Sequence, residues 1–103
     1  MQDDVLTLVS QTFEKNEYGV RVPATSNREV FIRVYSITRQ EFYEAGRNGL
    51  NPAYKFSLFA ADYLGETECV YHGQPYAIYR TYRVPESDYI ELYVERKGGT
   101  NGP

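Results

Sequence analysis

The chain has 103 residues, of which 42% are hydrophobic and 24% charged, and its formal net charge is −3. This length is typical of one domain, and the composition is that of a globular protein and does not suggest disorder. A protein that neutralises many phosphates carries a basic stripe, so the acidic balance disfavours a nucleic-acid-binding protein. Tyrosine is abundant, with 11 copies and no tryptophan, and tyrosine is common in half-exposed walls and in interfaces.

Cysteine content and the N-terminus bear on the compartment in which the protein is made. Cys69 is the sole cysteine, which excludes an intramolecular disulfide and a cysteine-based zinc cluster. The first residues lack the basic and apolar regions of a signal peptide. No run approaches the roughly 18–20 apolar residues of a membrane span. We therefore expect a protein that is made in the cytoplasm and has no membrane partner.

The first third of the chain predicts three strands. Residues 5–13 form the first, and residues 20–22 pair back on it across the polar turn at residues 14–19. Residues 23–27 contain proline, serine and asparagine, which favour a flexible connection. Residues 28–37 form the third strand. The first and third strands are apolar on both faces.

A single helix is predicted after the third strand. Thr38 and Glu41 have the spacing of a capping box, in which each side chain bonds the other residue's backbone amide. Ile37 and Phe42 stand at the two positions of a hydrophobic staple. The helix should be about three turns long. Gly46 weakens it by about 1 kcal/mol relative to alanine, so we expect Gly46 to allow close approach to a strand.

The second half of the chain reads as strands separated by turns. Residues 53–61 form the fourth strand, and residues 62–66 predict a hairpin turn around a glycine. Residues 67–97 predict a meander of three short strands, the last two at residues 76–83 and 89–96. Aromatic and β-branched residues dominate these last two strands, as suits a pleated, half-buried surface.

These elements predict an all-β fold with one short helix. Six or seven short strands with turns between them favour a small antiparallel β-barrel over residues 1–97, with the helix inserted after the third strand. Residues 98–103 predict a disordered tail, because they cannot bury anything. Strands that are apolar on both faces carry more apolar side chains than one barrel interior can bury. This favours burial of the remaining side chains under the helix or against another subunit.

No set of residues predicts catalysis, a cofactor site or a metal site. His72, the sole histidine, lies beside a glycine and is expected to be an exposed turn residue. Cys69 is expected to be buried and structural, because a reactive thiolate needs a nearby base. The clustered carboxylates are expected to be solvated surface groups, namely Asp3 with Asp4, Glu66 with Glu68, and Glu91 with Glu95.

One alternative is a monomeric barrel that binds single-stranded nucleic acid. Tyrosines and arginines of residues 76–83 could form a stacking platform. Strict alternation puts Tyr79 on one face with Arg83, and puts Tyr82 on the opposite face with Arg80. Side chains divided between both faces of a β-strand are poorly placed to stack on one nucleic-acid strand. Cross-strand aromatic packing is therefore the preferred interpretation.

Four segments together carry a resemblance to a known family. Residues 36–52, 56–66, 70–82 and 88–97, in this order, resemble the head-tail joining proteins of tailed bacteriophages that infect Gram-positive bacteria. The similarity covers about residues 28–97. The succession of segments is more specific than any one segment.

This resemblance implies a head closure, or stopper, protein. Such proteins are small β-barrels that assemble as a ring beneath the portal and adaptor proteins, retain the packaged genome and dock the tail. The implied partners are further copies of the chain, the portal or adaptor protein, a tail-terminator or tail-completion protein, and genomic DNA that passes without specific binding. The family has no catalytic residues, and the implied location is the virion. A tail terminator or another connector component is the nearest alternative.

Residues for these roles can be named. Two-sided apolar strands suit the lateral faces of a ring subunit. The candidates for the subunit interface are Tyr76, Tyr79, Arg80, Tyr82 and Arg83. Related stoppers project a loop between early strands into the channel, which implies the candidates Asn16, Glu17, Tyr18, Thr25, Ser26 and Asn27.

Overall fold

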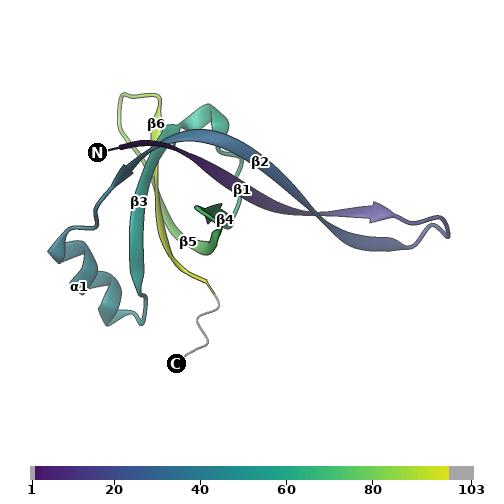
Figure 1. The fold of residues 1–103 in the computed structure, drawn as a ribbon, viewed down its shortest axis with the longest axis horizontal. Coiled ribbons are helices and arrows are strands. Elements are labelled where there is room, and N and C mark those ends of the chain that lie inside the picture. The colour runs from purple at the N-terminus through teal and green to yellow at the C-terminus, as the bar shows by residue number, and fades with distance from the viewer. Residues whose placement is uncertain (1, 98–103) are drawn as a thin grey trace.

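A computed structural model describes residues 2–97, which form a closed antiparallel barrel of six strands with one short α-helix (Figure 1). Around the barrel the order is β1-β2-β3-β6-β5-β4. The strands are β1 (Gln2–Lys15), β2 (Arg21–Tyr35), β3 (Pro52–Phe59), β4 (Glu68–Tyr71), β5 (Gln74–Arg83) and β6 (Tyr89–Arg96), and the helices are α1 (Arg39–Arg47) and the short 3₁₀ helix η1 (Ala60–Asp62). The predicted β-barrel is therefore confirmed, and the predicted tail lies outside the described residues.

The core fills the inside of the barrel with alternate residues of every strand. Side chains two positions apart point to the same face of a strand, so pairs of apolar residues at this spacing turn inward together. The largest fully buried side chains are Phe56, Leu6, Leu8, Leu58, Leu92, Val94 and Cys69. The expectation that Cys69 is buried is confirmed.

Helix α1 follows the second strand, so its predicted place after a third strand is wrong. Residues 23–27 belong to β2 and are not a flexible connection. The Asn16 amide donates to the Val20 carbonyl at 2.9 Å, and hydrogen-bonded pairs alternate from there along the ladder. Pro23, opposite Phe13, falls at a position whose nitrogen points away from β1. Proline therefore costs this ladder no hydrogen bond, and the strand continues through it.

Strands β1 and β2 pair with each other far beyond the barrel. Their register runs without a break from Gln2↔Val34 to Lys15↔Arg21. In the described chain, β4 pairs with β1 at Thr7–Val9, and β3 pairs with β2 at Arg33–Tyr35. Residues 10–26 therefore have only each other as strand partners, and we call this two-stranded segment the arm. Figure 1 shows the arm projecting to one side of the barrel.

The predicted start of α1 is confirmed. The Glu41 amide donates to Thr38 Oγ1 at 3.1 Å, and the Thr38 amide donates to Glu41 Oε1 at 2.9 Å. Ile37 is half-buried and Phe42 is exposed, and both line one hollow beside the end of β2. Gly46 does not approach a strand: a Cβ placed there would meet nothing within 4 Å. That expectation is therefore wrong, because Gly46 lies on the exposed side of the helix.

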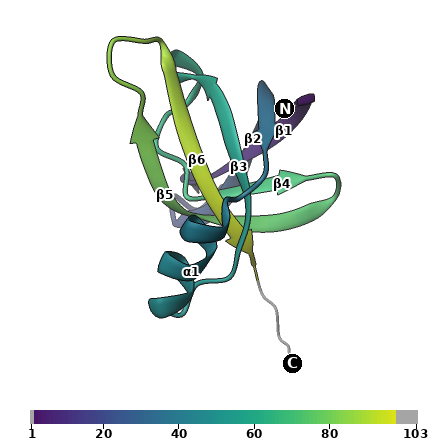
Figure 2. The ribbon, with the colours of Figure 1, turned by 90° about the vertical axis from the view of Figure 1, so that its left-hand side faces the viewer.

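Helix α1 lies against the outside of the barrel, over β3 and β6 (Figure 2). Lys55 Nζ lies 3.3 Å from Glu41 Oε2 and 5.7 Å from the centre of the Tyr93 ring. The Arg80 guanidinium lies over the same ring at 4.8 Å. Burial would raise the pKa of Glu41, but the Thr38 hydrogen bonds and Lys55 outweigh it and hold the pKa below its ordinary value. Tyr93 is only 6% exposed and lies beside the helix.

The connection between β3 and β4 is not the predicted hairpin turn. Strand β3 pairs with β2 and β6, whereas β4 pairs with β1 and β5, so residues 60–67 cross between distant strands. Glu66 in this connection is only 7% exposed, and its Oε2 lies 2.6 Å from Arg28 Nη2. The Leu64 amide donates to Glu66 Oε1 at 3.0 Å. The expectation that Glu66 is a solvated surface group is wrong, because this carboxylate anchors the crossing segment to β2.

The predicted three-strand meander is confirmed as β4, β5 and β6. Strands β4 and β5 are joined by His72 and Gly73, which have φ values of 51° and 77°. Positive φ at both central residues is the signature of a two-residue hairpin turn that matches the strand twist. His72 is an exposed turn residue, as expected.

Candidate interaction site

Of the large apolar side chains exposed on the described surface, the two most exposed, Tyr18 and Phe31, lie in two different groups. One lies on the barrel, where Phe31 is 81% exposed beside Phe59 and Val5. The other lies at the end of the arm, where Tyr18 is 82% and Phe13 is 58% exposed. Clustered exposed apolar groups mark sites of interaction with another molecule. We therefore build the candidate site from these two surfaces.

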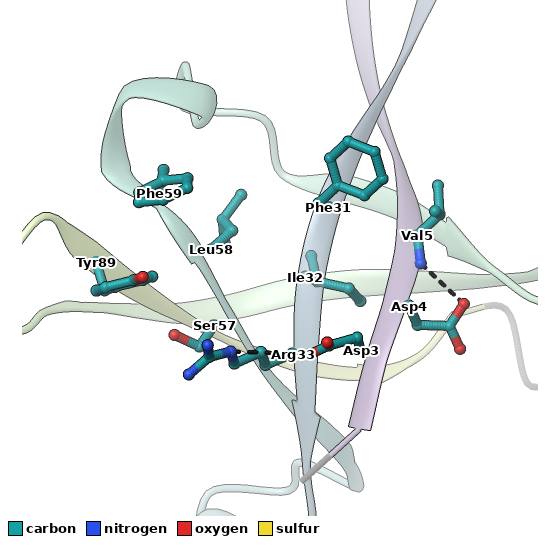
Figure 3. A pocket seen from close by; sticks show the side chains of 10 residues that line it. All are labelled: Asp3, Asp4, Val5, Phe31, Ile32, Arg33, Ser57, Leu58, Phe59 and Tyr89. Carbon is teal, nitrogen blue, oxygen red and sulfur yellow. Dashed lines mark hydrogen bonds and ion pairs between the residues drawn. The ribbon is translucent and has the colours of Figure 1, made fainter.

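The barrel surface is hollowed into a groove of about 520 Å³ (Figure 3). Apolar side chains lie around one part of it, and polar side chains gather at the other end. The lining residues are Asp3, Asp4, Val5, Phe31, Ile32, Arg33, Ser57, Leu58, Phe59 and Tyr89. Arg33 Nε lies 3.8 Å from Asp3 Oδ1, and the Asp3 side chain is 88% exposed. We call this surface the groove.

Strand pairing explains why apolar residues gather in the groove. Val5 lies directly opposite Phe31 in the β1–β2 register, so both point to the same face, while Leu6 and Val30 point into the core. Phe59 lies opposite Tyr89 in the β3–β6 register. The Phe59 and Tyr89 rings stack with centroids 5.0 Å apart. The exposed side chains of the groove thus belong to the outer face of these strands, and Ile32 and Leu58 of the core also line it.

Asp4 fixes the polar end of the groove. Its Oδ1 accepts the Val5 amide at 2.8 Å, and its Oδ2 accepts the Tyr71 hydroxyl at 2.9 Å. His72 Nε2 lies 2.8 Å from the same oxygen. The Val5 amide, followed by the Tyr71 hydroxyl, holds the pKa of Asp4 below its ordinary value. Burial and the neighbouring Asp4 raise the pKa of Tyr71 to about 12. The cluster keeps a negative charge beside the groove.

At the end of the arm the chain makes a tight, internally bonded turn. Asn16 Oδ1 accepts the amides of Tyr18 at 2.9 Å and Val20 at 3.0 Å. Gly19 has a φ of 77°, which a residue with a side chain rarely adopts. The channel-loop candidates Asn16, Glu17 and Tyr18 all lie in this turn. The turn is held by its own bonds, so it presents Tyr18 in a defined position.

One face of the arm is aromatic and cationic. Phe13 and Lys15 on β1 lie opposite Pro23 and Arg21 on β2, so the four side chains share this face. The Arg21 guanidinium lies 5.0 Å from the centre of the Phe13 ring. Glu14 points to the opposite face. We call the shared surface the Phe13 face.

The second group of channel-loop candidates is not a loop. Thr25, Ser26 and Asn27 lie within β2, where they pair with Gln11, Ser10 and Val9 of β1. The expected loop is wrong for the reason given above, since β2 runs through Pro23 without losing a hydrogen bond. The three side chains are exposed, Thr25 and Ser26 within the arm and Asn27 next to it.

The interface candidates of β5 are separated by a bulge. Ile78 pairs with Val94 but Arg80 pairs with Tyr93, so Tyr79 is an extra residue and the alternation of faces shifts. The Tyr79 and Tyr93 rings lie 6.4 Å apart, on the same side as Arg80. The expected common face for Tyr79 and Arg83 is therefore wrong.

The five interface candidates differ in exposure. Tyr76 is 4% exposed and belongs to the core. Tyr79 and Arg80 line a hollow beside α1. Arg80, Tyr82 and Arg83 are exposed, and their role in a subunit interface stays a prediction.

Three observations on residues 2–97 bear on metal binding, thiol reactivity and membrane crossing. In that part of the chain, no three histidine, cysteine or acidic side chains are placed to hold a metal ion. Burial raises the pKa of the Cys69 thiol to about 12, so it is protonated at neutral pH. Within the same residues, no helix has the length and hydropathy needed to cross a bilayer.

The groove was not identified as a site from the sequence, although a signal for it exists. Residues 5–13 and 28–37 are apolar on both faces, and the groove is where their outer faces meet. No family model matches the chain, and no curated protein matches it.

Proposed function

We propose that this chain is a structural head-tail connector subunit of a tailed bacteriophage, of the head closure type. It assembles as a ring beneath the portal and adaptor proteins, retains packaged DNA and docks the tail. The observation that supports this most is a small barrel with an internally bonded arm and an exposed apolar groove. A ring subunit needs two different interaction surfaces, one for each neighbouring subunit. The ordered sequence resemblance supports the same role.

The function follows from assembly and not from catalysis. The partners in this proposal are further copies of the chain, the portal or adaptor protein on the head side and a tail-terminator or tail-completion protein on the tail side. Genomic DNA passes through the ring without specific binding, which agrees with a net charge of −3. The protein resides in the virion after synthesis in the host cytoplasm, and it requires no cofactor and no membrane.

Electron microscopy of reconstituted connectors tests the proposal. The purified chain is mixed with the portal and adaptor proteins of the phage that encodes it, and separately with the tail-terminator protein. We expect an added ring on the portal–adaptor complex. A ring that forms only on the tail tube would assign a tail terminator instead. Failure to bind any of these proteins would contradict a connector function.

A matched pair of variants separates assembly from folding in this experiment. Phe31→Ser changes an exposed groove residue, and Tyr43→Ser changes an exposed residue of α1. Both variants should fold, because neither side chain belongs to the core. We expect the groove variant to lose ring formation and the helix variant to keep it.

A further inference from the structure

We propose that the Phe13 face of the arm in one copy docks into the groove of the next copy. This inference rests on the proposed connector function, because it names the two surfaces that join neighbouring subunits. The occupant of the groove is thus a second copy of this chain.

The two surfaces have complementary chemistry. The Phe13 face presents an aromatic ring next to two cations, Lys15 and Arg21, which lie opposite each other. The groove presents Phe31 and Phe59 and carries Asp3 at its open end. Aromatic groups and arginine are enriched in the centres of protein interfaces. Opposite charges at the rim fix orientation and speed association.

More acidic groups lie next to the groove than basic ones. Asp4 keeps its negative charge through the bonds described above. A neighbouring hollow shares Phe59 with the groove and adds Asp62 and Asp88 against one arginine, Arg83. The negative sign of this region suits the positive sign of the Phe13 face.

Distance excludes docking within one copy. The pair Phe13↔Pro23 lies eight positions along the ladder from the pair Val5↔Phe31. At about 3.3 Å per residue the two surfaces are about 26 Å apart on one continuous ribbon. The arm cannot fold back on its own groove without breaking the β1–β2 ladder. A contact between two different surfaces on separate copies is heterologous, and repeating it generates a ring or a filament.

Side chains, and not strand addition, carry the contact. An exposed strand edge invites another strand, but a proline on that edge interrupts the row of donors. Pro23 occupies an outward position on the free edge of β2 and offers no amide hydrogen there. The Phe13 face is therefore the part of the arm best suited to a specific partner.

Crosslinking between two tagged populations of the full chain tests the contact. One population carries Glu17→Cys in the arm turn, and the other carries Ala61→Cys beside Phe59. A short bis-maleimide reagent is added to the mixture, and mixed dimers are counted. The control pair is Glu17→Cys with Glu44→Cys on the exposed side of α1. Native Cys69 is buried and protonated, so it does not react.

We expect at least a tenfold higher yield of mixed dimers for Glu17→Cys with Ala61→Cys than for the control pair. Arg21→Asp in the arm population should lower that yield about tenfold. Asp3→Arg in the groove population should then restore most of it, because the charges match again. Glu44→Arg, a matched change on α1, should have no effect.

Each contrary outcome overturns the inference. A yield equal to that of the control pair shows that the arm does not reach the groove. Dominant linkage between two Glu17→Cys arms shows pairing of arm with arm. Linkage of the arm to DNA or to another protein in assembled connectors shows that it lines the channel or contacts that partner. Rings without arm–groove linkage leave the connector function standing, whereas linkage without connector binding removes that function alone.

Discussion

Strands β1 and β2 run through both the barrel and the arm but are held differently in the two regions. In the barrel, β1 and β2 have a second strand neighbour, and their inner side chains such as Leu6 are fully buried. In the arm the same strands have only each other, and residues 11–20 are all exposed. Folding free energy is therefore concentrated in the barrel. The arm is available for contacts with other molecules because the core does not use it.

The largest effect on folding is expected from Phe56→Ala in the barrel. Phe56 is fully buried, and its ring lies 5.6 Å from Tyr54 and 5.0 Å from Tyr71. Truncation should lower the free energy of unfolding by about 3–5 kcal/mol, measured by urea titration. The matched change in the arm is Phe13→Ala, which should lower it by less than about 1 kcal/mol. Equal losses at the two positions would remove the distinction between barrel and arm.

A smaller effect is expected where the arm joins the barrel. Arg28→Ala removes the partner of the buried Glu66 carboxylate. We expect a loss of about 1–3 kcal/mol, because an unpaired buried charge is costly but Arg28 is itself partly exposed. The control is Lys97→Ala, which removes a more exposed partner, that of Glu68, and should cost less than about 1 kcal/mol. A loss at Arg28 no larger than at Lys97 would show that Glu66 is not an anchor.

The helix cap should contribute about 1 kcal/mol. Thr38→Ala removes the hydroxyl that accepts the Glu41 amide, and such caps are worth about that amount. Thr38→Ser keeps the hydroxyl and should retain most of the stability. Urea titration and circular dichroism would show the difference. Equal stability of the alanine and serine variants would contradict the capping role.

The smallest effect is expected at acid pH from Asp4. Its pKa is lowered in the folded state, so its contribution to stability is complete above the unfolded pKa of about 4. The contribution is lost as the pH falls through the lower folded pKa. Urea midpoints measured from pH 6 to pH 2.5 should fall less steeply for Asp4→Asn than for the wild type. Parallel curves would show that Asp4 does not contribute.

Local chemistry determined how much of the fold was predictable. The start of α1 was predicted to the residue, because Thr38 and Glu41 act within one turn of helix. The β4–β5 turn was predictable for the same reason, since Gly73 permits the required backbone. The sequence predicts two separate strands where the structure has the single strand β2, because the local preferences of residues 23–27 favour a turn. Pairing with β1 keeps these residues extended.

Long-range contacts account for the other errors. Glu66 is buried by Arg28, which lies 38 residues earlier, and no local pattern predicts that pairing. The bulge at Tyr79 contains no glycine that would indicate it in the sequence. Strict alternation of side chains between the two faces of β5 therefore predicts the wrong face for the residues on one side of the bulge. For the candidate site, apolar residues on both faces of the strands predicted an interaction surface but not its place. Its place depends on where β1, β2 and β3 meet.

Ring assembly by a chain with an altered arm tests the central claim most directly. Phe13→Ser with Arg21→Asp changes the Phe13 face and leaves the barrel untouched. The account predicts that the free energy of unfolding stays within about 1 kcal/mol of the wild type. It also predicts that electron microscopy shows no ring on the portal–adaptor complex. Rings that form as readily as with the wild type, from an equally stable chain, would contradict it.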